Sequence, residues 1–290
     1  MPLTLVGRVE QTDAIRVIHA ALDAGMTWID TADVYCLDDG DIGYGERLIA
    51  RALRERTGGR GEPIVATKGG LRRPGGRWES DARPQRLKAA CEASLKALGA
   101  EAIFLYQLHA PDPKVPWVDS VGAMSDLRRE GKIQHVGLSN VGVDEIQQAR
   151  GVVPIASVQN RCSALDRRPF VDGVLDLCQK EKIAFIAHSP VGGHRQQGRI
   201  GDHPTLRAVA SRNRASPYQV ALAWLLASSP VMFVIPGASR AESAESSARA
   251  ADLVLGDRDR EDLNKAFPDA SPFLKHVASA KRKIRQMLRF

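Results

Sequence analysis

Four residues of the sequence form a set that could transfer a proton during hydride chemistry: Asp30, Tyr35, Lys68 and His109. Reduction of a carbonyl carbon leaves negative charge on oxygen, so a positioned acid must protonate or stabilise that oxygen. Tyrosine is a weak acid with a reference pKa of ~10, and a neighbouring cation lowers that pKa. Lys68 could supply the charge, Asp30 could hold Lys68 in place, and His109 could donate a hydrogen bond to the carbonyl. The set therefore predicts Tyr35 as a general acid.

These residues and several other polar ones follow short apolar runs that are typical of buried strands. The runs are Thr27–Ile29, Ile64–Thr67, Ile103–Leu108, Gln134–Leu138, Ala156–Val158, Ala184–Ala187 and Met232–Ile235. The first six end in polar residues, which are Asp30, Lys68, His109, Ser139 with Asn140, Gln159 with Asn160, and Ser189. Singly, each has a structural explanation, such as a helix cap at Asp30, a solvated Lys68 or a hydrogen-bonded core His109. Together they predict one site at the carboxyl ends of the strands.

Helical segments alternate with these strands, at Thr12–Ala24, Gly45–Glu55, Arg83–Leu98, Trp117–Glu130, Val143–Ala149, Val171–Glu181, Pro217–Ala227 and Arg240–Ala250. Such alternation requires parallel strands with helical crossovers. No GxGxxG motif follows an early strand, so an open nucleotide-binding sheet loses its main sequence support. We predict a single α/β domain over residues 1–290, a (β/α)8 TIM barrel. Its first strand is short or missing, because only Leu3–Val6 could precede the first helix.

Composition places the chain among globular proteins, since 43% of the residues are hydrophobic and 26% are charged. No apolar run approaches the ~18 residues that span a bilayer, and the N-terminal residues lack the pattern of a signal peptide. The four cysteines lie far apart without a CxxC pair. This spacing predicts reduced thiols and a cytoplasmic location.

The formal net charge of +7 is concentrated in the C-terminal basic segment 270–290, where six Lys or Arg and no acidic residue occur. The remainder of the chain is nearly neutral. A nucleic-acid-binding protein more often spreads its basic residues over a folded face, so we expect no nucleic-acid partner. The segment could contact an anionic membrane or a partner, and a solvated terminal helix is the other explanation.

Seven motifs in chain order resemble those of the aldo-keto reductase superfamily. They are Asp30-Thr31-Ala32-Asp33-Val34-Tyr35 with Glu46, Val65-Ala66-Thr67-Lys68, Tyr106-Gln107-Leu108-His109, Gly137-Leu138-Ser139-Asn140, Val158-Gln159-Asn160, Ser189-Pro190-Val191-Gly192 and Ile235-Pro236-Gly237-Ala238-Ser239-Arg240. The resemblance extends from about Thr12 to Ala250. It implies a (β/α)8 barrel and reversible carbonyl reduction with NADPH. The implied catalytic tetrad is Asp30, Tyr35, Lys68 and His109.

By the same resemblance, the later motifs bind the cofactor NADP(H) through Ser139, Asn140, Gln159, His188, Ser189, Val191, Gly192, Pro236, Gly237, Ser239 and Arg240. Ser139, Asn140 and Gln159 offer donors and acceptors for the nicotinamide amide, and capping of the next helix is the alternative for the first two. Backbone amides near Gly192 could hold the pyrophosphate. Ser239-Arg240 begins a helix whose free amides attract phosphate. Its arginine could pair with the 2′-phosphate that distinguishes NADPH from NADH.

Several residues depart from the family pattern. His188 stands where the family usually has an aromatic ring against the nicotinamide, and Ser246-Ser247 replace a Glu-Asn pair that contacts adenine. Cys36 stands in place of a glycine and could face the pocket or be a packed thiol. Trp78 and Trp117 could line the substrate pocket or pack on the surface.

Two functions of different classes follow from these observations. The first is an enzyme that reduces a small-molecule aldehyde or ketone to an alcohol with NADP(H), with Tyr35 as general acid. The second is an NADP(H)-binding but catalytically weak barrel that acts as a regulatory or partner-binding subunit. The intact tetrad favours the enzyme, whereas the short first strand, His188 and Ser246-Ser247 favour the alternative. A metal-dependent hydrolase is excluded, because no His-x-His motif follows an early strand.

Overall fold

The structure, a computed structural model, describes residues 3–5, 7–58, 61 and 63–269. These described residues form two compact units, one within Met1–Gln159 and Ile235–Arg249 and the other within Asn160–Val234 and Ala250–Phe290. The prediction of a single domain over residues 1–290 stays a prediction. The basic segment 270–290 and its proposed contacts lie outside the described residues.

The first unit contains a parallel sheet with strands in the order β1, β2, β5, β6 and β7. The strands are Trp28–Asp30, Ile64–Gly69, Ile103–Leu108, Ile133–Ser139 and Ile155–Arg161, the last of which belongs to this unit up to Gln159. The register places Lys68 beside Gln107 and Ser139 beside Gln159. Polar side chains therefore lie together at the carboxyl ends of the strands, as the sequence predicted.

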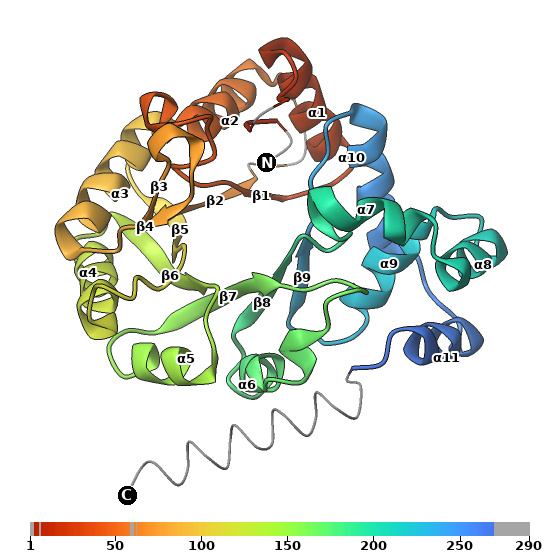
Figure 1. The fold of residues 1–290 in the computed structure, drawn as a ribbon. Helices are drawn as coiled ribbons and strands as arrows, with labels where there is room; N and C mark the ends of the chain where they lie inside the picture. The colour runs from red at the N-terminus through yellow and green to blue at the C-terminus, as the bar shows by residue number, and fades with distance from the viewer. Residues whose placement is uncertain (1–2, 6, 59–60, 62, 270–290) are drawn as a thin grey trace, which may run out of the picture. The chain divides into compact units, whose positions relative to one another are not determined.

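Six helices of the first unit are α1 Gln11–Asp23, α2 Tyr44–Glu55, α3 Pro84–Leu98, α4 Trp117–Arg129, α5 Val143–Arg150 and α10 Ala241–Ala248. Figure 1 shows α1 to α4 along the outer face of the strands and α10 beside α1, although α10 comes more than 200 residues later. The apolar residues of α1 repeat at helical spacing, and Ile15, Ile18 and Leu22 pack against Leu48 and Ile49 of α2. Burial of this stripe explains the position of α1 without a strand before it.

The second unit contains the strand β8 Ala184–His188 and most of the strand β9 Met232–Ile235. Its helices are α6 Val174–Lys180, α7 Gly193–Gly201, α8 Pro204–Arg212, α9 Pro217–Leu226 and α11 Asp257–Ala266. Its core includes Leu206, Trp224, Leu263 and Phe267. The Trp224 indole N–H donates to the Asn264 side chain at 3.1 Å, which satisfies its buried polar atom. None of the helices in the described ranges is long and apolar enough to cross a membrane.

Each predicted strand and helix has a counterpart in the structure. The glycines predicted to end helices, Gly25, Gly99 and Gly131, all have positive φ. Helix α6 begins later than the predicted Val171, because Gly173 precedes it at φ 86°. The hairpin β3 Leu71–Arg72 with β4 Glu79–Ser80, and helices α7, α8 and α11, were not predicted.

No strand precedes α1 within the described residues, in agreement with the prediction that the first strand is short or missing. The segment Leu3–Val6 was the candidate for that strand. Residues Leu3, Thr4 and Leu5 form a turn and bend instead, and Val6 lies outside the described residues.

Gly137 in β6 allows a close approach of side chains from both neighbouring strands. A Cβ at this position would lie 2.4 Å from Ser157 Oγ and 2.7 Å from Gln107 Cγ. Both neighbours are buried, so we expect Gly137→Ala to lower the free energy of unfolding by about 1–3 kcal/mol in urea denaturation. Gly122→Ala in α4 is the control, because nothing lies within 4 Å of the added Cβ. That variant should be about 0.5–1 kcal/mol more stable. Equal effects of the two substitutions would contradict this account.

Candidate active site

Lys68 and Asp30 form an ion pair in the interior of the first unit. Lys68 Nζ donates to Asp30 Oδ2 at 2.5 Å and to the backbone oxygen of Thr31 at 2.7 Å. The Lys68 side chain is 0% exposed and that of Asp30 is 5% exposed. An isolated ammonium at this depth would be strongly destabilising, so the carboxylate is required. The alternatives of a solvated Lys68 and of a helix cap at Asp30 are wrong, because both side chains are committed to this pair.

The second carboxylate oxygen of Asp30 accepts two further hydrogen bonds. Gln107 Nε2 donates to Asp30 Oδ1 at 3.0 Å, and Gln159 Nε2 donates to the same oxygen at 2.8 Å. Gln159 therefore directs its amide nitrogen to Asp30, whereas the sequence predicted it for the cofactor. Gln107 was not predicted, although it is the polar residue within the apolar run Ile103–Leu108. Three donors from three strands hold the Asp30 carboxylate in one orientation.

Tyr35 and His109 lie against this ion pair. Tyr35 is in the loop after β1, and Lys68 Nζ lies 4.9 Å from the centroid of its ring. The ring of His109, the residue directly after β5, meets the Tyr35 ring edge to face with centroids 5.7 Å apart. Both residues are less than 10% exposed. The structure thus brings together all four members of the predicted tetrad.

For both Tyr35 and Lys68, burial and the neighbouring charges shift the pKa in opposite directions. Burial raises the pKa of Tyr35 above its ordinary value, while the charge of Lys68 and a hydrogen bond with it lower the pKa by less. The net direction is opposite to the one predicted from the sequence. Burial lowers the pKa of Lys68, but the charges of Asp30 and Tyr35 outweigh burial and leave that pKa raised. Near neutral pH the phenol is protonated and the ammonium is charged, which are the forms that a general acid and its cation require.

Asn140 and Ser139 follow β6 and connect to His109. Asn140 Nδ2 donates to the backbone oxygen of His109 at 3.0 Å and to Ser139 Oγ at 3.1 Å. Asn140 has φ 58°, a left-handed conformation that asparagine tolerates. The N-cap of α5 is Gly142, so the helix-cap alternative for these two residues is wrong.

The predicted pyrophosphate segment lies in the second unit, in a turn between β8 and α7. His188 ends β8, and its Nδ1 hydrogen bonds with Ser189 Oγ at 3.2 Å. After Val191, Gly192 is the N-cap of α7 with φ 87°, and a Cβ there would lie 2.9 Å from the backbone of Gln196. Glycine is therefore required, and the free amides of the first turn of α7 follow it.

The predicted adenosine-phosphate segment lies in the first unit, between β9 and α10, and comprises Pro236, Gly237, Ser239 and Arg240. Arg240 is the N-cap of α10, which begins at Ala241, and its side chain is exposed. Ser247 Oγ donates to the backbone oxygen of Ser243 at 2.9 Å, so this hydroxyl is used within the helix. Arg240 therefore places a positive charge at the start of α10.

Of the three side chains that the sequence assigned either to the pocket or to packing, Trp78 lies beside the tetrad, whereas Trp117 and Cys36 are packing residues. Trp78 is 46% exposed, and its ring lies edge to face with those of Tyr35 and His109. It therefore borders the tetrad. Trp117 instead donates its indole N–H to the backbone oxygen of Glu145 at 3.0 Å, a packing contact between α4 and α5. Cys36 is buried, and burial raises the pKa of its thiol to about 12, as expected of a packed thiol.

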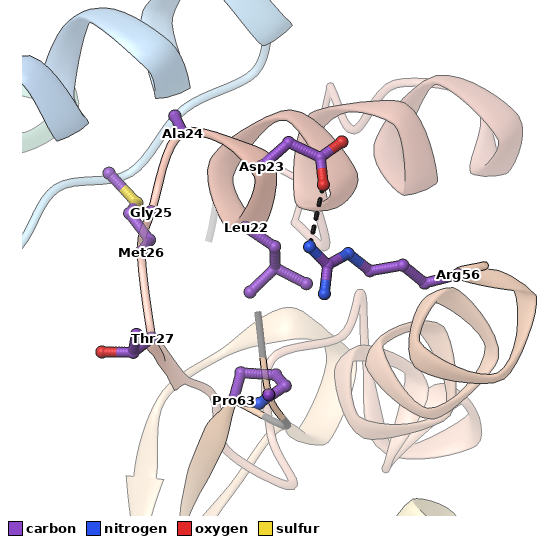
Figure 2. A pocket seen from close by; sticks show the side chains of 9 residues that line it. Leu22, Asp23, Ala24, Gly25, Met26, Thr27, Arg56 and Pro63 are labelled. Carbon is purple, nitrogen blue, oxygen red and sulfur yellow. Dashed lines mark hydrogen bonds and ion pairs between the residues drawn. The ribbon is translucent and has the colours of Figure 1, made fainter. Parts of the chain in front are cut away.

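A separate cavity of about 480 Å³ lies at the opposite ends of the same strands. Residues Leu22–Thr27, which precede β1, and Pro63, which precedes β2, line it (Figure 2). Arg56 crosses it and donates to Asp23 at 2.8 Å. Among the described residues that line the cavity, the charged ones are Asp23 and Arg56, and these two pair with each other.

The sequence matches the aldo/keto reductase family over residues 3–267, and the chain belongs to this family. An uncharacterized oxidoreductase of Schizosaccharomyces pombe is 37% identical over 236 residues, 80% of this chain and 72% of that protein. An aldo-keto reductase of Strobilurus tenacellus is 31% identical over 284 residues, with 88% and 81% covered. The crystal structure of an aldo-keto reductase from Klebsiella pneumoniae in complex with NADPH has a TM-score of 0.75 at 25% identity, covering 89% and 86% of the chains. The predicted α/β barrel class is thereby confirmed.

Two further carboxyl groups are buried next to the ion pair. Thr67 Oγ1 donates to Glu46 Oε1 at 2.6 Å, and the backbone N–H of Val34 donates to Asp33 Oδ1 at 2.7 Å. Burial, followed by the charge of Glu46, raises the pKa of Asp33 to about 8. Asp33 is therefore a buried acid that holds its proton at neutral pH.

This raised pKa predicts a pH dependence of stability. The unfolded carboxyl titrates near pH ~3.9, so between about pH 4 and about pH 8 the folded protein holds a proton that the unfolded chain has released. Stability therefore falls as pH rises across this window, by up to about 1.4 kcal/mol per pH unit. Asp33→Asn keeps a side-chain oxygen that can accept the hydrogen bond from the Val34 N–H, but the amide does not titrate. Its advantage over wild type should grow from about pH 5 to about pH 8, to a few kcal/mol in urea denaturation. Asp13→Asn, at an exposed site of α1, should run parallel to wild type. Parallel curves for Asp33→Asn would show that its pKa is ordinary.

Proposed function

We propose that this protein is an NADP(H)-dependent oxidoreductase that reduces an aldehyde or ketone to an alcohol, with Tyr35 as the general acid. The observation that carries the proposal is the buried Lys68–Asp30 ion pair against Tyr35, with His109 beside the same ring. Membership of the aldo/keto reductase family supports it. A buried acid, a fixed cation and a neighbouring imidazole are the groups that carbonyl reduction requires.

In this mechanism the carbonyl oxygen of the substrate lies between Tyr35 and His109. As negative charge grows on that oxygen, the Tyr35 phenol donates its proton and His109 donates a hydrogen bond. The ammonium of Lys68 stabilises the phenolate that forms, since the two charges attract at low dielectric. Asp30 keeps the ammonium in place, and Gln107 and Gln159 keep Asp30 in place. Reversal of the same proton transfer serves alcohol oxidation.

NADPH, when bound, supplies the hydride, and the residues present fit it. The turn at Ser189–Gly192 leads into the N-terminal amides of α7, and Gly192, the N-cap at φ 87°, has no side chain that could cover them. Arg240, exposed at the start of α10, suits a 2′-phosphate. The Klebsiella pneumoniae relative was crystallised with NADPH, which supports the same cofactor here. Ser139 and Asn140 at the carboxyl end of β6 are the residues we assign to the nicotinamide.

A small-molecule carbonyl substrate and a cytoplasmic location complete the proposal. All four cysteines are buried and unpaired, as expected in a reducing compartment. The alternative of a catalytically weak regulatory subunit receives no support from the relatives described above, which are named as oxidoreductases or aldo-keto reductases.

Removal of one oxygen atom tests the general acid. Tyr35→Phe keeps the ring that packs on His109 and should lower kcat by at least about 10²-fold across a panel of aldehydes and ketones. NADPH binding, followed by nucleotide fluorescence, should be retained. Tyr44→Phe is the control, because Tyr44 lies in α2 beneath Arg8. Full activity of Tyr35→Phe would refute the mechanism, and NADPH binding by wild type without turnover of any substrate would favour the regulatory alternative.

The cofactor preference depends on Arg240 in this proposal. Arg240→Gln should raise the Kd for NADPH about tenfold, because a charge-assisted contact with the 2′-phosphate is lost, and should change the Kd for NADH little. Fluorescence titration measures both constants. Arg249→Gln, at the exposed other end of α10, is the matched control and should bind both nucleotides as wild type does. Equal losses for NADPH and NADH in Arg240→Gln would remove the 2′-phosphate contact from the proposal.

A further inference from the structure

The loop after β2 contains three arginines that differ in how their charge is balanced. Arg72 lies 3.5 Å from Asp39 and Arg77 lies 3.4 Å from Glu79, and both arginines are exposed. Arg73, between β3 and β4, is only 4% exposed. No carboxylate forms an ion pair with its guanidinium in the part of the chain that the structure describes.

The hydrogen-bond donors of Arg73 are also largely unused. Nη2 donates to the backbone oxygen of Leu37 at 3.3 Å, while Nε and Nη1 are buried and have no hydrogen-bond partner among the described residues. Asp39 accepts instead from the backbone N–H of Arg73 at 2.8 Å, and its other oxygen pairs with Arg72. A buried cation without a counter-ion is unfavourable. An arrangement of this kind is stabilised when a ligand brings the missing negative charge.

Trp78 connects this guanidinium to the tetrad. Arg73 Cζ lies 4.0 Å from the centroid of the Trp78 ring. The same ring lies edge to face with Tyr35 at 6.4 Å and with His109 at 6.3 Å. A substrate whose carbonyl contacts Tyr35 and His109 therefore has Trp78 as a neighbour, and the cation lies behind that ring. Trp78 is half-exposed, and exposed side chains change rotamer within nanoseconds, so rotation of the ring can uncover Arg73.

We propose that Arg73 binds an anionic group of the substrate, so that the preferred substrates are carbonyl compounds bearing a carboxylate or a phosphate. The inference rests on the proposed reductase function. A guanidinium forms charge-assisted hydrogen bonds with both anions, and a low-dielectric site strengthens them. The width of the Trp78 ring separates the cation from Tyr35 and His109, so once that ring has turned aside, a substrate with one benzene ring between its carbonyl and its anionic group spans the distance.

Three aldehydes that share a benzaldehyde frame and differ in the para substituent test this assignment with NADPH: para-carboxybenzaldehyde, para-formylphenyl phosphate and the uncharged para-methylbenzaldehyde. Wild type should show a kcat/KM about tenfold higher for an anionic aldehyde than for the methyl compound. Arg73→Gln should lower this ratio about tenfold, chiefly through KM. Comparison of the two anionic aldehydes shows whether carboxylate or phosphate is the group bound.

Arg72→Gln and Arg77→Gln are matched controls, because each removes one positive charge from the same loop. Both should keep the wild-type ratio, which separates a specific contact from a general effect of charge. A ratio near one in wild type, or an unchanged ratio in Arg73→Gln, would overturn the inference. An equal loss in all three variants would also overturn it.

Wild type alone provides a second test in case Arg73→Gln does not fold, as judged by circular dichroism. Raising NaCl from roughly 20 mM to roughly 300 mM should raise the KM for the anionic aldehyde several-fold and leave that for the methyl aldehyde nearly constant. An equal salt response of the two would count against Arg73.

If wild type reduces neither aldehyde, or if Tyr35→Phe retains full activity, the reductase function itself fails. If wild type reduces the methyl aldehyde in a Tyr35-dependent way but shows no preference for the anionic aldehydes, the inference about Arg73 fails and the reductase function stands.

Discussion

Lys68 carries a fully buried ammonium group, and Asp30 is the carboxylate that pairs with it at 2.5 Å. Most of the site follows from the need to keep this pair together at low dielectric, where an unpaired charge would be strongly destabilising. Asp30 ends β1 and Lys68 lies in β2, so the pair depends on the register of those two parallel strands. Gln107 from β5 and Gln159 from β7 complete the coordination of the carboxylate. Strands β1, β2, β5 and β7 are thereby connected at their carboxyl ends through the Asp30 side chain.

The same burial sets the protonation of the surrounding acids. Tyr35 keeps its proton because desolvation outweighs the nearby cation, and Asp33 keeps its proton for the same reason. Lys68 keeps its charge because two partners outweigh desolvation. In the function we propose, a neutral phenol beside a charged ammonium means that the proton donor and its stabilising cation are in place before a substrate arrives. Such preorganisation is the main contribution of a protein to this type of chemistry.

The substrate side of the tetrad depends on elements that have no part in the sheet of the first unit. The β3–β4 hairpin follows Lys68 along the chain and returns Trp78 to the rings of Tyr35 and His109. It also buries Arg73 under that ring, while its neighbours Arg72 and Arg77 remain exposed. In the function we propose, proton transfer and substrate choice therefore reside on separate parts of the chain.

The amino-acid sequence alone determined the succession of the parallel strands and of most helices along the chain, and it predicted the four residues of the tetrad. Apolar runs of strand length and amphipathic segments reveal the elements locally, and a lysine or histidine at the end of an apolar run is conspicuous because burial penalises it. Helices α7 and α11 escaped prediction, because the first contains three glycines and the second is mostly charged. Only the tertiary structure decided that Gln107 and Gln159 hold Asp30, that burial raises the pKa of Tyr35, and that Arg73 lacks a carboxylate partner. Those properties depend on distances and on exclusion of water, and such quantities arise only when segments far apart in the chain pack together.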